Sequence, residues 1–261
     1  YVKYQFQLTN ELQGFADLQY RRVLYNIGGF RGNPDLQVRN TWNFFNPKLG
    51  LVYNVNDWQL YASYSHGQKE PNRDDFEAGM NEQPKPEKLH DFELGVEKKR
   101  SDYNWGATLY YMLYKDQLVL TGKINDVGSY TRTNVPESYR MGIELQGGIR
   151  FTPWLNVAGN VTLSRNIIHD FKEFTDAYDA NFDYLGQHIT SHGSTDIALS
   201  PDITGAGTIN ILPVKNLEIS LLGKYVSRQY LDNTSNKMRS LDPYYVQDAR
   251  LSYTLRNIGI K

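Results

Sequence analysis

Trp-Gln-Leu-Tyr-Ala-Ser-Tyr-Ser-His-Gly-Gln, residues 58–68, is the stretch that decides the fold. Its first, third, fifth and seventh residues are aromatic or aliphatic, and the residues between them are mostly polar. A period of two is that of a β-strand with one apolar face and one wet face. A short turn at residues 54–57 precedes the stretch, and a mostly polar run at residues 68–87 follows it. We therefore expect a long strand between a tight turn and a long loop.

The same unit of tight turn, alternating strand and long loop recurs along the whole chain. Turns of three or four residues alternate with long polar segments, which we expect at residues 26–41, 68–87, 123–138, 168–195 and 228–243. Long loops at one end and short turns at the other are typical of outer-membrane barrels. A soluble β-sandwich is the alternative, but it has no reason to keep all its long loops at one end. The expected alternating strands number about eleven and begin near Val2, Leu12, Phe45, Trp58, Phe92, Tyr103, Met141, Leu155, Ile203, Leu217 and Ala249.

Composition supports this interpretation and excludes several function classes. The 261 residues include 20 Tyr, and aromatic residues make up 13% of a chain that is otherwise polar. The net charge of -1 gives no support to nucleic-acid binding, and the absence of Cys excludes a thiolate metal site. No run of 18 apolar residues exists, which excludes a membrane-spanning helix but not a barrel. The sequence begins as if in the middle of a strand, so we expect it to be a piece of a longer protein.

Several stretches resemble the C-terminal part of TonB-dependent outer-membrane receptors, especially those of Bacteroidetes-type bacteria. The resemblance implies an all-β fold, an antiparallel up-and-down transmembrane β-barrel meander of about 11 strands, as a fragment of a 22-stranded barrel. Residues 1–261 would be part of one barrel domain, without its N-terminal plug and its last strands. The stretches that carry the resemblance are Asn46-Pro47-Lys48-Leu49-Gly50-Leu51-Val52-Tyr53, Leu60-Tyr61-Ala62-Ser63-Tyr64-Ser65, Lys85-Pro86-Glu87-Lys88, Phe92-Glu93-Leu94-Gly95-Val96, Ser138-Tyr139-Arg140-Met141-Gly142-Ile143-Glu144-Leu145 and Ser240 to Tyr253.

The resemblance also implies a function and partners. It implies a receptor in the outer membrane of a Gram-negative bacterium that takes up a scarce substrate on energy from TonB, and no enzymatic activity. A ferric siderophore or another iron complex is the favoured substrate, with cobalamin or a glycan as rivals and a passive porin or structural barrel as the other class. The implied partners are outer-membrane lipid, the plug of the same parent chain, the TonB complex through an absent N-terminal segment, the small-molecule substrate and a surface lipoprotein. No cofactor of the protein's own is expected.

Ligand contacts are expected where charged and aromatic side chains adjoin in the long loops. An anionic iron complex favours Arg and aromatic partners. The loops concerned cover residues 73–77, 130–132, 184–192 and 228–230. The candidate residues are Arg73, Asp74, Tyr130, Arg132, Tyr184, His188, His192, Arg228 and Tyr230.

Strand parity predicts the roles of two further sets of residues. Charged side chains on the wet face would line the lumen and contact a plug, or pair with one another across strands. Aromatic side chains just after short turns on the apolar face would lie at the membrane interface, whereas Trp154 also follows a turn but has the opposite parity. The lumen set is Arg140, Glu144, Arg150, Glu218 and Lys224, and the interface set is Trp58, Tyr103 and Trp105.

Two kinds of chemistry are weighed against these interpretations. His188 and His192, with Asp183 nearby, have the spacing of a metal site on a helix, but in a polar loop that spacing means little. Asp74, Asp75 and Glu77 lack the spaced pattern of a calcium loop. Nothing marks a serine for a Ser-His-acid hydrolase. We therefore predict no metal or catalytic site.

Overall fold

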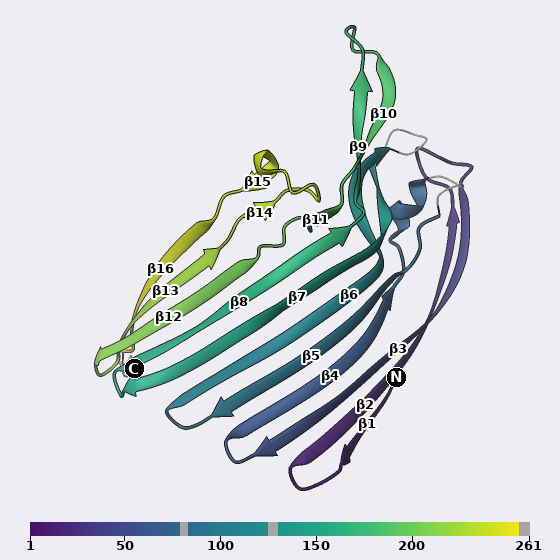
Figure 1. Ribbon diagram of the computed structural model, residues 1–261. Helices are drawn as coiled ribbons and strands as arrows, with labels where there is room; N and C mark the ends of the chain where they lie inside the picture. The colour runs from purple at the N-terminus through teal and green to yellow at the C-terminus, as the bar shows by residue number, and fades with distance from the viewer. Residues whose placement is uncertain (79–82, 125–129, 256–261) are drawn as a thin grey trace, which may run out of the picture.

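The computed structural model describes residues 1–78, 83–124 and 130–255. Within these residues the chain forms one antiparallel sheet of 12 strands, in the order β1-β2-β3-β4-β5-β6-β7-β8-β12-β13-β16, with β11 beside β8 (Figure 1). The strands of this sheet are β1 (Val2–Gln7), β2 (Leu12–Gly28), β3 (Gln37–Val55), β4 (Trp58–Lys69), β5 (Glu87–Lys99), β6 (Tyr103–Ile124), β7 (Tyr130–Thr152), β8 (Leu155–His169), β11 (Ser194–Asp196), β12 (Ile203–Val214), β13 (Leu217–Val226) and β16 (Tyr244–Tyr253).

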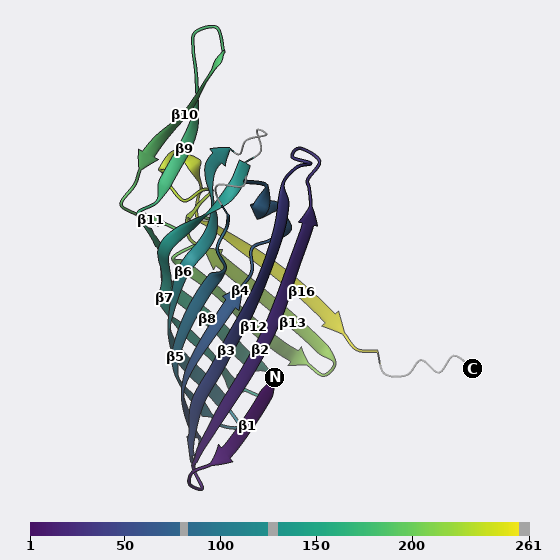
Figure 2. The same ribbon diagram turned by 90° about the vertical axis from the view of Figure 1, so that its right-hand side faces the viewer.

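Smaller elements lie in the long connections at one end of the sheet, which we call the mouth. Two of them form a hairpin that stands away from the sheet (Figures 1 and 2). The smaller elements are η1 (Arg73–Ala78), β9 (Lys172–Tyr178), β10 (Tyr184–Ser191), β14 (Gln229–Tyr230), η2 (Lys237–Arg239) and β15 (Ser240–Leu241), and the hairpin consists of β9 and β10. Neither short helix of the described part has the length or the apolar character needed to cross a membrane.

The sheet is an open meander. β1 pairs only with β2, and β16 pairs only with β13, among the described residues. Figure 2 shows the sheet curving so that these two outer strands lie apart. The prediction of an antiparallel barrel meander is therefore confirmed, and the sheet is not closed. The eleven predicted strands correspond to the eleven strands of the strand order given above.

Short turns close the end opposite the mouth, and their sequences suit them. Asn56 occupies the turn between β3 and β4 with a φ of 52°, and Asn216 the turn between β12 and β13 with a φ of 71°. Asn tolerates this left-handed conformation better than most residues. Such turns set the register that places β3 against β4 and β12 against β13.

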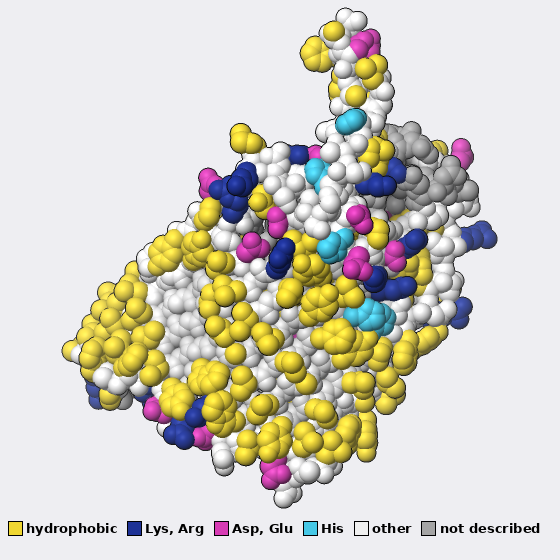
Figure 3. All heavy atoms as spheres, viewed as in Figure 1, with side chains coloured by type: hydrophobic (Ala, Val, Ile, Leu, Met, Phe, Trp, Pro, Cys, Tyr) yellow, Lys and Arg dark blue, Asp and Glu magenta, His cyan; other side chains and the backbone are white. Residues whose placement is uncertain are grey.

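Register confirms that the two side-chain sets lie on opposite faces. Leu51, Ala62, Leu94, Leu109 and Ile143 are successive cross-strand partners, so they share one face, which we call the apolar face. The alternate residues form the polar face. Figure 3 shows apolar side chains covering the strands, with charged side chains and histidines gathered toward the mouth.

Aromatic rings on the polar face cover glycines of the neighbouring strand. Tyr61 on β4 lies directly opposite Gly95 on β5, and a Cβ at Gly95 would collide with the Tyr61 ring. The Tyr61 hydroxyl reaches further, to 2.9 Å from Thr108 Oγ1 on β6. The same relation joins Phe15 to Gly50 and Tyr110 to Gly142. These rings fill the space that the glycines leave and help to fix the register.

Three of the predicted loops are wrong in extent. Residues 26–41 were expected to be a loop, but β2 runs to Gly28 and β3 begins at Gln37. Residues 123–138 were also expected to be a loop, yet β7 begins at Tyr130. Residues 168–195 form a hairpin rather than an irregular loop. In the first two cases strands of the main sheet continue past the apolar belt, where both faces are wet and alternation is lost. In the third case β9 and β10 form a two-stranded sheet of their own.

Candidate functional site

The connection between β4 and β5 folds back onto the polar face at the mouth. Its η1 helix places Phe76 in a buried apolar cluster with Phe30, Leu36 and Val38. Trp42 packs against this cluster, with its ring 5.9 Å from that of Phe76. Burial of a Phe side chain stabilises a structure by about 1.5–3 kcal/mol. The apolar anchor therefore holds η1 in place beside the charged residues that surround it.

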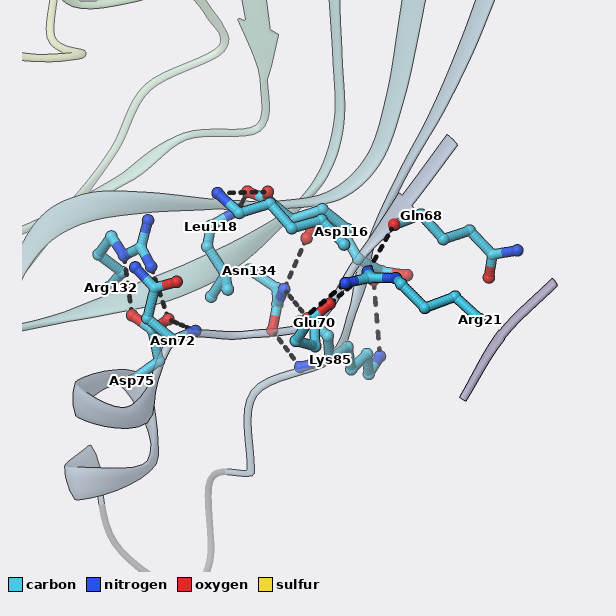
Figure 4. A network of polar contacts seen from close by, with 12 residues as sticks. Arg21, Gln68, Glu70, Asn72, Asp75, Lys85, Asp116, Leu118, Arg132 and Asn134 are labelled. Carbon is cyan, nitrogen blue, oxygen red and sulfur yellow. Dashed lines mark hydrogen bonds and ion pairs between the residues drawn. The ribbon is translucent and has the colours of Figure 1, made fainter. Parts of the chain in front are cut away.

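A buried carboxylate next to this anchor ties η1 to β7 (Figure 4). Asp75 is 4% exposed and accepts hydrogen bonds from Arg132 Nε at 2.8 Å and Nη2 at 2.6 Å. The backbone N–H of Asn72 donates to the same carboxylate at 2.7 Å. These bonds to Asp75 raise the pKa of Arg132 above its usual value, although burial opposes the shift. A bidentate pair of this kind fixes both position and orientation.

The two ends of the same connection are held by further polar contacts (Figure 4). Glu70 forms an ion pair with Arg21 of β2, whose Nη1 donates to Glu70 at 3.0 Å. Asn134 Oδ1 accepts from the Lys85 N–H at 2.8 Å, and Asn134 Nδ2 donates to the Lys85 carbonyl at 2.9 Å. The same Asn134 Nδ2 donates at 2.6 Å to the carbonyl of Asp116, a residue with a φ of 55°. The mouth is therefore bordered by a built network that joins β2, β6 and β7.

The β9–β10 hairpin is attached to the mouth through Glu173. Its carboxylate accepts from Arg239 Nη2 at 2.8 Å and from His192 Nε2 at 3.0 Å. Burial raises the pKa of Glu173, but the hydrogen bonds from Arg239 and His192 outweigh it and lower the pKa below its usual value. Arg239 also pairs with Asp232 at 2.8 Å. This cluster connects the hairpin to the β13–β16 connection.

A second anchor joins the hairpin to β6. Gln187 donates to the carbonyl of Gly122 at 2.7 Å and accepts from the N–H of Ile124 at 3.1 Å. Gly122 has a φ of 82°, and a Cβ there would collide with the Phe174 carbonyl. The close approach of hairpin and β6 therefore requires glycine at this position.

The tip of the hairpin is ordered by its own side chains. Asp179 Oδ1 accepts from the N–H groups of Asn181 and Asp183, both at 2.8 Å. Between them Phe182 has a φ of 67° and is 86% exposed. The rings of Tyr178 and Tyr184 meet 5.7 Å apart just below. The tip thus carries exposed aromatic surface on a rigid turn.

The structure leaves some of the predicted ligand residues exposed and engages others in contacts that hold the fold. Arg73 and Asp74 are exposed on η1, and the Arg73 guanidinium lies 4.8 Å from the Phe30 ring centre. Tyr184 and His188 are exposed on β10. Arg132 is held by Asp75, His192 by Glu173, and Arg228 by Asp242 at 2.8 Å. Tyr230 lies on β14 and accepts from Leu199 N–H through its carbonyl. Tyr130 begins β7, and its side chain lies outside the described part of the structure.

The two histidines considered as a metal site do not act as a pair. His188 lies on β10 opposite Thr175, whereas His192 follows β10 and binds Glu173. Within residues 1–78, 83–124 and 130–255 no group of three or more His, Cys, Asp or Glu residues is arranged to hold a metal ion.

The five predicted lumen residues lie on the polar face, as their parity requires. Arg140 Nη1 donates to Ser200 Oγ at 2.8 Å, and Glu218 pairs with Arg250 at 3.2 Å. Glu144 lies opposite Thr108, Arg150 opposite Asn156, and Lys224 opposite Ala206. Within the described residues, no ion pair joins two members of this set. Glu218 thus pairs across strands with a charge outside this set, and both roles foreseen for the set remain predictions.

The predicted interface aromatics cluster at the turn end of the apolar face. Trp58 and Trp105 meet edge to face with their ring centres 5.4 Å apart. Lys98 Nζ lies 4.6 Å from the Trp58 ring and 5.9 Å from the Tyr103 ring. Such amphipathic rings with a nearby cation suit a boundary between apolar and aqueous surroundings.

Sequence reasoning missed the residues that hold the mouth together. Glu173, Gln187 and Arg239 draw together segments far apart in the chain, and no local pattern marks them. It also missed a second aromatic row on the apolar face near the mouth. The row includes Tyr64, Phe92 and Tyr111, which are cross-strand partners. Their alternation in the sequence was the available signal for this row.

Solved structures with the same fold include three receptors and transporters. The chain is similar to the ferric yersiniabactin uptake receptor FyuA from Yersinia pestis (TM-score 0.66, 19% identity, 96% of this chain and 37% of that one). It is similar to the copper transporter OprC (TM-score 0.73, 13% identity, 98% of this chain and 38% of that one). It is also similar to the siderophore receptor PiuA from Acinetobacter baumannii (TM-score 0.71, 15% identity, 96% of this chain and 35% of that one). The chain thus spans little more than a third of the length of these proteins.

No functionally curated protein is detectably similar to the chain in sequence. The family description "TonB dependent receptor-like, beta-barrel", by contrast, matches residues 1–261. This match agrees with the open antiparallel meander, the opposed faces and the long connections at the mouth. The chain therefore belongs to the TonB-dependent receptor family and forms part of its β-barrel.

Proposed function

We propose that this chain is part of an outer-membrane transporter of a Gram-negative bacterium that takes up a scarce iron complex, such as a ferric siderophore. The observation that carries the proposal is the family match over the whole chain, because members of this family are outer-membrane transporters and not enzymes. Energy would come from the TonB complex, acting on a plug domain of the same parent protein.

The arrangement of the mouth supports this proposal. Exposed Arg73 and Asp74 on η1, and Tyr184 and His188 on the hairpin, offer charged and aromatic contacts. The Asp75–Arg132 pair and the Glu173 cluster hold these elements firmly. Substrate capture requires contacts whose positions are fixed before binding. The polar face below, with Glu144, Arg150 and Lys224, would line the path of the substrate.

Uptake by the full-length receptor tests the proposal. Cells that lack the receptor gene are complemented with native or variant receptor, and uptake of radiolabelled ferric siderophore is measured with and without TonB. We expect uptake that requires both receptor and TonB. Arg73→Gln, Tyr184→Ala and His188→Ala should each weaken binding, whereas Lys215→Gln, exposed at a turn far from the mouth, should not.

Other outcomes would identify another function. Uptake of cobalamin or of a glycan, without uptake of any iron complex, would replace the substrate but keep the transport class. Steady ion conductance of the full-length protein in a planar bilayer, independent of TonB, would indicate a passive porin. Unchanged affinity in all three variants would exclude the mouth residues as the substrate contacts.

A further inference from the structure

The apolar face changes character in regular steps toward the mouth. Cross-strand pairing arranges its side chains in rows that run across several strands. An aliphatic row is followed by an aromatic row, then by a row with two histidines, and finally by a charged row. The successive rows are Ala62, Leu94, Leu109 and Ile143; Tyr64, Phe92, Tyr111 and Met141; His66, His90, Leu113 and Tyr139; and Gln68, Lys88, Lys115 and Glu137.

The charged row contains two lysines directly opposite each other. Lys88 of β5 and Lys115 of β6 are cross-strand partners. Like charges in this arrangement destabilise a sheet unless an anion lies between them. Lys115 forms an ion pair with Glu137, which is its partner on β7. Lys88 is exposed and forms no ion pair with any residue of the described ranges. Within the described ranges, one positive charge of the row is therefore uncompensated.

The row immediately below is suited to a membrane interface. The His66 and His90 rings lie 4.4 Å apart, and Tyr64 OH is 2.9 Å from His90 Nδ1. His66 Nδ1 donates to the Leu89 carbonyl at 3.0 Å. Tyr139 is in the same row, and Tyr rings are enriched where acyl chains meet headgroups. If the apolar face contacts lipid, as the proposed function requires, Lys88 and Lys115 lie at headgroup level.

We propose that Lys88 and Lys115 bind the phosphate of an anionic membrane lipid, whose acyl chains lie over the His66–His90 row and the aromatic row. The position of the lysines favours a lipid over free phosphate, because they border the apolar belt rather than the mouth. Their charge favours an anionic lipid over a zwitterionic one, because each Lys near a membrane surface attracts anionic headgroups. The lipid phosphate would supply the counter-charge that Lys88 lacks.

Native mass spectrometry of the full-length receptor in mild detergent tests this inference. The receptor is titrated with dioleoylphosphatidylglycerol, which is anionic, and with dioleoylphosphatidylcholine, which is zwitterionic. We expect preferential retention of the anionic lipid. Lys88→Gln should weaken that retention about fivefold and leave the zwitterionic lipid unaffected. Lys69→Gln is the matched control, because Lys69 is exposed at the same level of the sheet but on the opposite, polar face.

A charge reversal gives a second readout that simple unfolding would not produce. Lys88→Glu places a carboxylate opposite Lys115, so we expect a higher melting temperature together with loss of the anionic lipid. Equal retention of the anionic lipid by native receptor and Lys88→Gln would overturn the inference. So would an equal loss in Lys69→Gln, or displacement of the lipid by millimolar inorganic phosphate. A receptor that binds neither lipid and stays monodisperse without detergent would instead contradict the proposed membrane location.

Discussion

At the scale of single residues, the polar face is organised by rings that cover glycines. Tyr61 covers Gly95 and bonds with Thr108, so one side chain links β4, β5 and β6. Glycine interrupts the side-chain rows of a strand and is usually destabilising there. The Tyr61 ring compensates by packing where a Cβ would otherwise lie. The identity of Gly95 is therefore dictated by its neighbour and not by backbone conformation.

We expect Gly95→Ala to destabilise the protein by about 1–3 kcal/mol, the usual range for overpacking. The added methyl group would displace the Tyr61 ring and break its bond to Thr108. Chemical unfolding in detergent micelles would measure the change. In the Tyr61→Ala background the same substitution should cost little, since the clash is gone. Additive effects of the two substitutions would contradict this account.

Leu109 and Thr108 are adjacent residues on opposite faces. Leu109 is 54% exposed in the middle of the apolar face. We expect Leu109→Arg to cost about 2–4 kcal/mol in a bilayer, because it places a charge at mid-depth. Thr108→Arg should cost less, since the polar face is wet and only the Tyr61 contact is lost. The free energies of unfolding of both variants in lipid vesicles measure this difference. A larger loss of stability for Thr108→Arg would show that the polar face, and not the apolar face, contacts lipid.

At the scale of elements, ion pairs help to hold both the β9–β10 hairpin and η1. The hairpin depends on Glu173, which is shared by Arg239 and His192. The η1 helix depends on Asp75, which binds Arg132, as well as on Phe76. Elements attached in this way respond to pH and to single charge changes.

The attachment of the hairpin should weaken in acid. The pKa of Glu173 lies below its usual value of 4.5, so the carboxylate stabilises the folded state above about pH 4.5. That contribution is lost as the pH falls through the lowered pKa of Glu173. Amide hydrogen exchange of β9 and β10 should rise in this acid range. Glu173→Gln should show the faster exchange already at pH 7 and little further change.

Removal of Arg132 should loosen η1. Arg132→Ala leaves Asp75 buried without its partner, and hydrogen bonds to charged groups contribute about 1.5–3 kcal/mol. We expect faster proteolysis of residues 70–78 in this variant. Arg73→Ala is the matched control, because Arg73 is exposed on the same helix and its guanidinium lies over the Phe30 ring. Equal proteolysis of the two variants would show that Asp75 does not anchor η1.

The sequence predicted strands well only where one face is apolar. Alternation around Leu60 and Leu109 gave both the strand and its face, because a one-residue shift would expose the whole apolar set. Between residues 26 and 41, β2 and β3 extend beyond the apolar belt, so nothing constrains alternate positions to be apolar. The predicted site was incomplete for a related reason. Glu173 and Arg239 are 66 residues apart, and only the folded chain brings them together.

At the scale of the whole molecule, the open sheet leaves a broad apolar face and, among the residues that the structure describes, unpaired backbone groups on the outer edges of β1 and β16. Unpaired strand edges are templates for association with other chains. We expect a polypeptide of residues 1–261 alone to associate in water, which light scattering after gel filtration would measure. In detergent the apolar face would be covered, and association should then depend on the two edges. A stable monomer in plain buffer would contradict the assignment of an apolar face to lipid.

The spacing between the Trp58 row and the row of Gln68 and Lys88 sets the membrane thickness that matches the protein. Ten residues of β4 separate Trp58 from Gln68, which corresponds to about 33 Å along the strand and about 25 Å across a bilayer at a barrel tilt near 40°. Membranes differ in hydrocarbon thickness, and each ångström of mismatch costs a fraction of a kcal/mol. Short-chain lipids should therefore accommodate the barrel without strain. Long-chain lipids would have to thin around it, so the bilayer itself becomes a variable that sets how stably the receptor is held.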